Sequence, residues 1–275
     1  MLTTEKRNEN TMHIDKMSTK KMLDAIQREN VCAVESVGRA IAEIETAVDK
    51  IFARMERGGR LFYVGCGTSG RIGVLDASEL PPTFGVSPDL VVGIIAGGDK
   101  ALRTAVEGAE DNYENGQRDI AEYGITANDS VIGISAAGGA AYVLGALEYA
   151  KTCGAFTVAL TSNNGTKIGN VADCCIVTDT GPEAVTGSTR MKAGTAQKLV
   201  LNMISTSLMV KAGYVYENFM INLQPTNIKL KNRMIGIVSE LTGKDMAESE
   251  QLLEKSSWNI KKAVSLNEEQ VKNYV

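Results

Sequence analysis

The residues that could do chemistry begin with a glycine-rich loop that carries two hydroxyl groups. An apolar run over 61–64 predicts a buried strand, and the loop Gly65–Gly70 follows it directly, ahead of a short predicted helix. Glycines let the backbone approach a ligand closely, and the free N–H groups at a helix start attract negative groups. The glycine spacing also fits a dinucleotide turn, but the acid that such a site needs comes late, at Asp99, after two flexible glycines. Thr68 and Ser69 therefore favour a single phosphate group, with a nucleotide-dependent dehydrogenase as a distant alternative.

Carboxylates that follow two of the predicted strands are candidate acid and base groups. Glu79 ends the short helical segment behind the glycine-rich loop. A cluster of acids follows the second predicted strand: Glu107, Glu110, Asp111 and Glu114. Acid–base catalysis requires two carboxylates in different environments, one protonated and one ionised. The residue types alone leave open which member of the cluster would act with Glu79, and most of these acids fit a solvated helix face equally well.

A third polar loop, 181–190, leads into a predicted helix and ends in hydroxyls and cations. The side chains that could hold an anion there are Thr186, Ser188, Thr189, Arg190 and Lys192. Anion binding at a helix start accounts for this composition. A helix that is simply well capped accounts for the hydroxyls but not for the two cations.

Strands and helices must alternate to position these loops. Apolar runs predict buried strands at 61–64, 91–95, 131–135, 156–161 and 175–178. Helical segments are predicted between them, near 71–80, 99–123, 140–152 and 166–172. This alternation indicates an α/β fold with a parallel sheet covered on both faces. Ligands bind at the carboxyl ends of such strands, where the loops 65–70, 135–140 and 180–189 lie.

Helical segments flank this core on both sides. Residues 1–17 are predicted to form an extended arm, followed by a helix through Lys20–Arg28 that Ser18 or Thr19 caps. An apolar stripe from Val34 to Met55 predicts one longer helix, and further helices are predicted at about 191–212, at 228–241 and in the tail. We therefore divide the chain into an N-terminal arm with helices (1–58), a central α/β domain that carries the binding loops (59–227) and a small C-terminal helical module (228–275).

Composition excludes several classes of function. The chain has 275 residues, 44% of them hydrophobic, and a net charge of -4, which does not suggest a nucleic-acid surface. No apolar run approaches the length of a membrane span, and no signal peptide is visible. The cysteine count of five is odd and without CxxC spacing, which favours reduced thiols in a cytoplasmic protein. His13 is the only histidine, which excludes a histidine triad and a multi-histidine metal site.

Three long motifs resemble one family closely. The segments GCGTSGRIGVLDASELPPTFG, AGGDKALRTAVEGAED and TGSTRMKAGTAQK, together with TEKRN near the start and QPTN further on, resemble N-acetylmuramic acid 6-phosphate etherases of the sugar-isomerase (SIS) domain superfamily. The resemblance covers roughly residues 3–265 and implies a five-stranded parallel sheet between helices. It also implies cleavage of the D-lactyl ether of N-acetylmuramate 6-phosphate to N-acetylglucosamine 6-phosphate and D-lactate, in cell-wall amino sugar recycling.

The resemblance further implies the roles of individual residues. Glu79 and Glu110 correspond to the catalytic acids, with no metal and no nucleotide cofactor. The substrate-binding residues that it implies are Thr68, Ser69, Ser135, Ser188, Thr189, Lys192, Arg7 and Asn8. The family forms homodimers, and Arg7 and Asn8 are expected to reach the pocket of a neighbouring subunit.

One turn departs from the family pattern. Where relatives read SASGRTPYV, this chain has SAAGGAAYV, so that Ala137, Gly139, Ala140 and Ala141 replace a serine, an arginine, a threonine and a proline. Each lost hydrogen bond to phosphate should cost about 1–3 kcal/mol of binding free energy. A protein that binds sugar phosphates without turnover, as the related glucokinase regulatory protein does, is therefore the alternative function.

Overall fold

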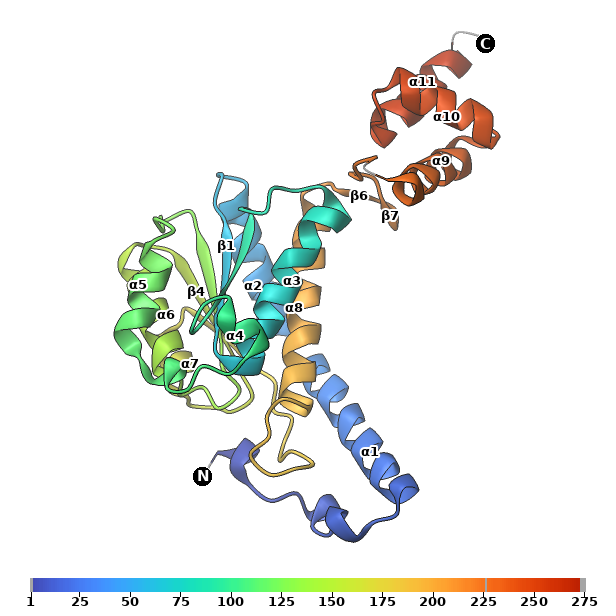
Figure 1. The fold of residues 1–275 in the computed structure, drawn as a ribbon. Coiled ribbons are helices and arrows are strands. Elements are labelled where there is room, and N and C mark those ends of the chain that lie inside the picture. Colours follow the sequence, from blue (N-terminus) through green and yellow to red (C-terminus); the bar gives the residue numbers. More distant parts are fainter. Residues whose placement is uncertain (1, 226, 273–275) are drawn as a thin grey trace. The chain divides into compact units, whose positions relative to one another are not determined.

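A five-stranded parallel sheet forms the centre of the fold (Figure 1). The computed structural model describes residues 2–225 and 227–272. The strands of this sheet are β1 (Leu61–Gly65), β2 (Val91–Ile95), β3 (Ser130–Ile134), β4 (Phe156–Thr161) and β5 (Cys174–Val177). Their order is β2-β1-β3-β4-β5, with every neighbouring pair parallel. The predicted α/β class is confirmed, and each predicted strand lies within one residue of the observed one.

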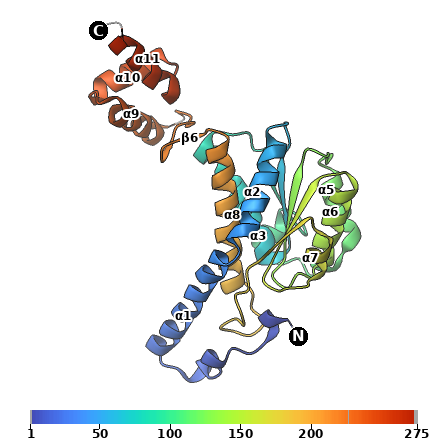
Figure 2. The same ribbon diagram turned by 180° about the vertical axis from the view of Figure 1, so that it is seen from behind.

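Helices cover both faces of the sheet (Figures 1 and 2). One face carries α5 (Tyr113–Ala121), α6 (Ala141–Thr152) and α7 (Lys167–Val171), and the other carries α2 (Ile41–Met55), α3 (Gly67–Phe84) and α8 (Lys192–Lys211). All residues of β1 and β3 are buried, which explains why these strands, apart from Ser130 at the start of β3, are apolar without alternation. Phe62 and Val64 pack in one hydrophobic cluster with Tyr142, Val143 and Leu147 of α6.

Two predicted helices have different bounds in the structure. The segment predicted at 99–123 is divided into α4 (Lys100–Arg103), a 3₁₀ turn (Ala109–Asp111) and α5. Gly108, at a φ of 69°, adopts a left-handed conformation that ends any continuous helix there. The segment predicted at 71–80 is longer, because α3 begins in the glycine-rich loop and continues through Pro81 and Pro82.

The N-terminal segment is folded onto the domain, so the predicted extended arm is wrong. It forms three 3₁₀ turns, Thr3–Glu5, Glu9–Thr11 and Ile14–Lys16. Its buried polar side chains make hydrogen bonds, since Thr4 Oγ1 accepts from Asn163 Nδ2 at 3.0 Å, and Asn163 Oδ1 accepts the backbone N–H of Thr3 at 2.7 Å.

The helix predicted from Val34 to Met55 is two helices in the structure. Helix α1 (Thr19–Gly38), capped by Ser18, ends before α2 begins at Ile41. Val34 in α1 and Ile41 at the start of α2 are both exposed, although both belong to the apolar stripe.

The C-terminal elements build a second core. They are β6 (Val215–Tyr216), β7 (Phe219–Met220), α9 (Ile228–Thr242), α10 (Met246–Lys255) and α11 (Ile260–Lys272). The buried residues of this core include Ile221, Leu223, Met234, Val238, Leu252, Leu253 and Ile260. Gly243, at a φ of 70°, ends α9 as predicted. Thr226 and residues 273–275, which belong to predicted segments, lie outside the described residues.

The chain divides into two compact units whose limits differ from the predicted domains. The first unit holds residues 2–78 and 88–208, and the second holds 79–87 and the described residues from 209 onward. Residues before 59 join the first unit because α2 packs against β4 and β5. Residues 209–225 join the second because Ile221 and Leu223 lie in its core. Within the described part of the chain, no helix is long and apolar enough to cross a membrane.

Candidate active site

The sheet topology places two of the predicted loops side by side. β1 lies between β2 and β3, so the chain moves from β1 to one side and then returns to the other. Ligands in parallel sheets bind at the carboxyl ends of strands that flank such a reversal. Gly65 and Ile134 are paired in register, and therefore the loop Gly65–Gly70 and the turn at Ser135 leave the sheet next to each other.

The glycine-rich loop is shaped by close packing between β1 and the start of α3. A Cβ atom on Gly65 would lie 2.7 Å from the Gly70 nitrogen, and one on Gly70 would lie 2.6 Å from the Gly65 carbonyl oxygen. Gly67 starts the helix at a φ of 52°. The glycines thus bring the helix start against the strand end, where Thr68 and Ser69 occupy the first turn. The N–H groups of that first turn have no acceptor within the helix.

The turn after β3 keeps its backbone in place without the side chains that relatives have. Ser135 Oγ accepts the N–H of Gly138 at 3.1 Å. The carbonyl of Ala136 accepts hydrogen bonds from the Ser162 N–H at 2.9 Å and from Asn163 Nδ2 at 3.0 Å. Compared with the family pattern, residues 137–141 lack side-chain groups. The backbone of the turn is nevertheless fixed by hydrogen bonds from Ser162 and Asn163, which follow β4.

The same replacements leave α6 without a capping side chain. Its N-cap residue is Ala140, which makes no side-chain hydrogen bond, where a threonine would supply one. Gly139 is exposed, and a Cβ atom there would meet nothing within 4 Å. The position at which the family pattern has an arginine is thus open to solvent in this chain.

The negative charge of Glu110 affects the pKa of Cys66 in the glycine-rich loop. Glu110 is exposed in the 3₁₀ turn Ala109–Asp111. Burial raises the pKa of the Cys66 thiol to about 12, and the negative charges of Glu110 and Asp111 contribute to the rise. Of the acid cluster, Glu110 and Asp111 are the members that reach the loop in this way. The thiol of Cys66 is accordingly protonated at neutral pH and cannot act as a nucleophile.

Alkylation should reveal this protonated thiol. We expect iodoacetamide at pH 8 to label the exposed Cys32 well before Cys66, because only a thiolate reacts and a pKa of about 12 leaves about one thiolate in 10⁴. Mass spectrometry of the two tryptic peptides over time measures the order. Equal labelling rates of Cys32 and Cys66 in the folded protein would contradict it.

The two acids of the DASE segment have different environments. Asp76 is buried and accepts hydrogen bonds from Tyr63 Oη at 2.9 Å and Ser205 Oγ at 3.1 Å, as well as from Asn202 Nδ2. Burial raises the pKa of Asp76 above its ordinary value, against these hydrogen bonds. Glu79 is exposed on the same helix. Asp76 therefore anchors α3 to β1 and α8, and Glu79 is the acid that is open to a ligand.

Charged groups at the third loop, 181–190, and at the start of α8 bind other residues of the same chain. The sequence instead predicted that Lys192 would bind an anionic ligand. The buried carboxylate of Glu183 accepts the N–H groups of Lys192 and Ala193, each at 3.0 Å, and so occupies the start of α8. The ammonium of Lys192 forms a buried ion pair with Glu29 of α1. Ser188 and Thr189 are half-buried just before α8. In this structure the loop therefore offers a ligand its hydroxyls rather than the Lys192 charge.

The Glu29–Lys192 pair gives a pH-dependent contribution to stability. Burial alone would raise the pKa of the Glu29 carboxyl, but hydrogen bonds from Lys192, Asn10 and Asn8 and the charge of Lys192 hold it below its ordinary value of 4.5. A lowered pKa in the folded state stabilises the protein above pH 4.5, and this contribution is lost as the pH falls through the folded-state pKa. Glu29→Gln should lower the free energy of unfolding by about 3 kcal/mol at pH 7.

Urea denaturation of the wild type and the variant from pH 3 to 7 measures this difference. The difference should begin to shrink below pH 4.5, where the unfolded chain takes up the proton, and should vanish below the folded-state pKa, where the folded wild-type carboxyl is protonated as well. Asp24→Asn is the control, because the Lys20–Asp24 pair on the same helix is exposed and should contribute little. A Glu29→Gln effect that does not depend on pH would contradict the charge pairing.

The N-terminal residues hold the third loop of their own chain. Asn8 is buried, its Nδ2 donates to the Pro182 carbonyl at 3.0 Å, and its Oδ1 accepts from Asn10 N–H at 2.9 Å. Thr11 Oγ1 donates to the Ala184 carbonyl at 2.9 Å. The expectation that Asn8 reaches a neighbouring subunit is thus not what this structure shows, because its amide is engaged in its own chain. Arg7 is exposed.

Sequence reasoning missed one residue beside the glycine-rich loop. Ser69 Oγ donates a hydrogen bond to Gln197 Oε1 at 3.0 Å. Gln197 lies in the TGSTRMKAGTAQK motif, one helical turn after Gly194, and a Cβ atom on Gly194 would lie 3.4 Å from Thr68. The three-residue step between Gly194 and Gln197 is the signal that could have identified the face of α8 that meets the loop.

Comparisons with known proteins identify the family. The chain is 53% identical over 263 residues to the N-acetylmuramic acid 6-phosphate etherase of Caldanaerobacter subterraneus subsp. tengcongensis, which covers 96% of this chain and 86% of the relative. It is 46% identical to N-acetylmuramic acid 6-phosphate etherase 1 of Bacillus licheniformis, over 97% of both chains. The chain belongs to the N-acetylmuramic acid 6-phosphate etherase family. In addition, residues 43–151 match the glucokinase regulatory protein N-terminal SIS domain, and residues 116–207 match the SIS domain.

Two solved structures share the fold of this etherase-family chain. A phosphoheptose isomerase from Francisella tularensis superposes with a TM-score of 0.53 at 22% identity, over 70% of this chain and 100% of that chain. The Vibrio vulnificus NanR protein complexed with ManNAc-6P superposes with a TM-score of 0.52 at 14% identity, over 71% of this chain and 65% of that chain. These likenesses support the SIS-domain fold.

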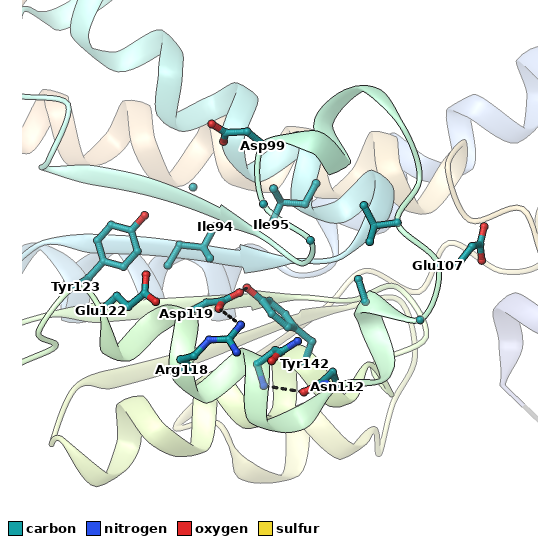
Figure 3. A pocket seen from close by; sticks show the side chains of 17 residues that line it. Ile94, Ile95, Asp99, Glu107, Asn112, Arg118, Asp119, Glu122, Tyr123 and Tyr142 are labelled. Atoms are coloured by element: carbon teal, nitrogen blue, oxygen red, sulfur yellow. Dashed lines mark hydrogen bonds and ion pairs between the residues drawn. The ribbon is translucent and has the colours of Figure 1, made fainter.

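A cavity beside β2 is a separate feature of this family member (Figure 3). It has a volume of about 570 Å³, and Glu107, just before the Glu110 turn, lines one end of it. Its charged lining residues are Asp99, Glu107, Asp119, Glu122 and Arg118. With four carboxylates and one guanidinium it disfavours a phosphate, so that the phosphate position is expected at the loop Gly65–Gly70 instead. In residues 2–225 and 227–272, no group of three histidine, cysteine or acidic side chains could hold a metal ion.

Proposed function

We propose that this protein is a lyase that cleaves the D-lactyl ether of N-acetylmuramate 6-phosphate, giving N-acetylglucosamine 6-phosphate and D-lactate. The observation that carries the proposal is the 46–53% identity to etherases over nearly the whole chain. The hydroxyls at the chain reversal and the charge of Glu110 beside them agree with it. The reaction belongs to cell-wall amino sugar recycling, and we place it in the cytoplasm, where the free thiols of all five cysteines fit a reducing environment.

Two carboxylates perform the proton transfers in this proposal. The open-chain sugar has an aldehyde at C1, which acidifies the proton on C2. One of Glu79 and Glu110 removes that proton, and the other protonates the lactyl oxygen as its bond to C3 breaks. D-Lactate leaves, and water then adds at C3 of the unsaturated aldehyde, which restores a hydroxyl there. No redox change occurs, and the step needs no cofactor.

The remaining site residues bind the substrate. Thr68, Ser69 and Ser135 donate hydrogen bonds to the phosphate from adjacent strand ends, together with the first-turn N–H groups of α3. Ser188 and Thr189 extend the same wall. Lys192 and Asn8 support this wall from behind, through Glu29 and the 182–184 segment, and Arg7 is free to meet a second subunit.

Release of D-lactate tests the proposal directly. Purified protein incubated with N-acetylmuramate 6-phosphate should release D-lactate, and Glu79→Ala should release almost none. Absence of lactate above the Glu79→Ala background would refute the enzyme function. Binding of a hexosamine 6-phosphate without turnover would favour the non-catalytic regulatory alternative, which the match to the glucokinase regulatory protein SIS domain and the altered 137–141 turn support.

A homodimer with shared sites is part of the proposal, because the resemblance implies dimers in which residues of one subunit reach the pocket of the other. In this proposal Glu79 of one subunit acts with the glycine-rich loop and Glu110 of its partner.

Mixing two inactive variants tests the shared site. Glu79→Gln and Glu110→Gln, co-refolded in equal amounts, should regain about a quarter of wild-type sites, since half of the dimers are mixed and each holds one intact site. Lactate release by the mixture, compared with each variant alone, is the measurement. If the mixture stays as inactive as its components, although mixed dimers form, each chain must carry a whole site.

A further inference from the structure

We propose that Gln197 is a positioning residue that directs the single hydroxyl hydrogen of Ser69, by turning over its side-chain amide when a phosphate group binds. This inference rests on the proposed function, in which Ser69 contacts the phosphate of the substrate. It gives a role to a residue to which neither the sequence analysis nor the catalytic and binding roles above assign one.

The contact joins two distant parts of the chain at the site. Ser69 is in the first turn of α3, and Gln197 is in the second turn of α8. Ser69 Oγ donates to Gln197 Oε1 at 3.0 Å, and Gln197 is only 1% exposed. Gly194 lets α8 approach, because a Cβ atom there would already touch Thr68 at 3.4 Å. The amide of Gln197 therefore lies directly behind the hydroxyls of the loop.

The hydrogen bond from Ser69 to Gln197 is not compatible with a phosphate bound by Ser69, because the hydroxyl has only one hydrogen. A serine hydroxyl has one hydrogen to donate and lone pairs that accept. A phosphate anion accepts hydrogen bonds and repels lone pairs. While Ser69 gives its hydrogen to Gln197, it can offer a phosphate only lone pairs. Ser69 must therefore change its donor direction before it can bind the anion.

The amide of Gln197 contains the group that permits this change. Its Nε2 is buried and, in the part of the chain that the structure describes, has no hydrogen-bond partner. Turning the amide by half a rotation places Nε2 against Ser69 Oγ, where it donates to an oxygen lone pair. The hydroxyl hydrogen is then free to point at the phosphate, in a chain from amide to hydroxyl to phosphate in which each bond polarises the next.

The turn requires no larger rearrangement. Before and after it, one hydrogen bond joins Gln197 to Ser69, and one end of the amide is without a partner. The two orientations of the free protein are thus close in hydrogen bonding, and a phosphate selects the second because only that one presents a donor. A bond that served only to hold α3 against α8 would not need an amide, since any acceptor would serve.

Four variants separate this role from a structural one: Gln197→Glu, Gln197→Met, Ser69→Ala and the double variant Ser69→Ala/Gln197→Met. Calorimetry gives the Kd of N-acetylglucosamine 6-phosphate, and lactate release gives KM and kcat. Once ionised, Gln197→Glu can only accept, so at a pH above the pKa of the new carboxyl, Kd and KM should rise about 100-fold with kcat within about threefold of wild type. Gln197→Met should raise Kd about tenfold in the wild-type background and hardly at all in the Ser69→Ala background.

The outcomes distinguish this inference from the proposed function. Additive effects in the double variant, or wild-type affinity in Gln197→Glu, would overturn the positioning role while lactate release still stood. Suppose that the wild type binds the sugar phosphate, the variants change Kd as expected, and no lactate is released. That result would support the positioning role and refute the etherase function. No binding of the sugar phosphate by the wild type would overturn both. Thermal melting checks that each variant is folded, and Gln197→Met serves if Gln197→Glu does not fold.

Discussion

Replacing Glu110 with glutamine is expected to lower kcat for D-lactate release by about 10²–10⁴-fold, with KM changed much less. Glutamine keeps the size and much of the hydrogen bonding of the side chain but cannot take up or give a proton. Glu110 is exposed in a 3₁₀ turn, so the change removes no buried contact and the fold should be unaffected. Steady-state kinetics with N-acetylmuramate 6-phosphate measure the effect.

The matched control for this variant is Glu114→Gln. Glu114 is also exposed and belongs to the same acid cluster, but it lies on α5 and is not among the charges that raise the pKa of Cys66. Its replacement should leave kcat within about twofold of wild type. Full turnover by Glu110→Gln, or an equal loss in Glu114→Gln, would show that the catalytic acid has been assigned to the wrong residue.

Restoring the side chains of the turn after β3 should have the second large effect, on KM. The variant Ala137→Ser/Gly139→Arg/Ala140→Thr should bind substrate about 100-fold more tightly, because a charge-assisted hydrogen bond contributes about 1.5–3 kcal/mol. The backbone of the turn is already held by Ser135, Ser162 and Asn163, so little ordering is needed. Gly139 has no left-handed φ, and its Cβ position is open, which makes an arginine there compatible with the turn.

Single variants separate binding from stability in this turn. Ala140→Thr should raise the free energy of unfolding by about 1 kcal/mol through its new helix cap, as urea denaturation would show. Gly138→Ala is the negative control, because Gly138 has a φ of 68° and its Cβ would lie 2.3 Å from Thr166. A KM that the triple variant leaves at the wild-type value would mean that this turn does not contact the substrate.

The carboxyl ends of the strands were predictable from the sequence because the apolar runs are unusually clear. β1 and β3 are buried on both faces, so residues 61–65 and 131–134 are apolar or glycine, and the loops with glycines and hydroxyls follow directly where the strands end. The resemblance then selected Glu110 from a cluster that residue types alone left unresolved. In the structure the charges of both Glu110 and Asp111 raise the pKa of Cys66, so electrostatics narrows the cluster to these two residues near the loop.

Other predictions failed where a residue's partner is distant in the sequence. The polar N-terminal segment was expected to be extended, but Thr3 and Asn8 bond to residues near 163 and 182, more than 150 positions away. Lys192 looked like an anion-binding cation, and Glu29, on α1, neutralises it. No local pattern reports such contacts, because the periodicity of a helix or strand reflects only which of its faces is buried.

In the glycine-rich loop, too, the local sequence predicted one part of the site and distant contacts determined the rest. Its amino-acid types alone indicated a phosphate site, since glycines, hydroxyls and a helix start are properties of a short segment. Only the tertiary structure decided that the Ser135 turn lies beside it, that Cys66 stays protonated, and that Gln197 accepts the hydrogen of Ser69. The physical reason is that hydrogen-bond direction and burial depend on what surrounds a side chain, and those surroundings come from β3 and α8, which meet the loop only after the chain has folded.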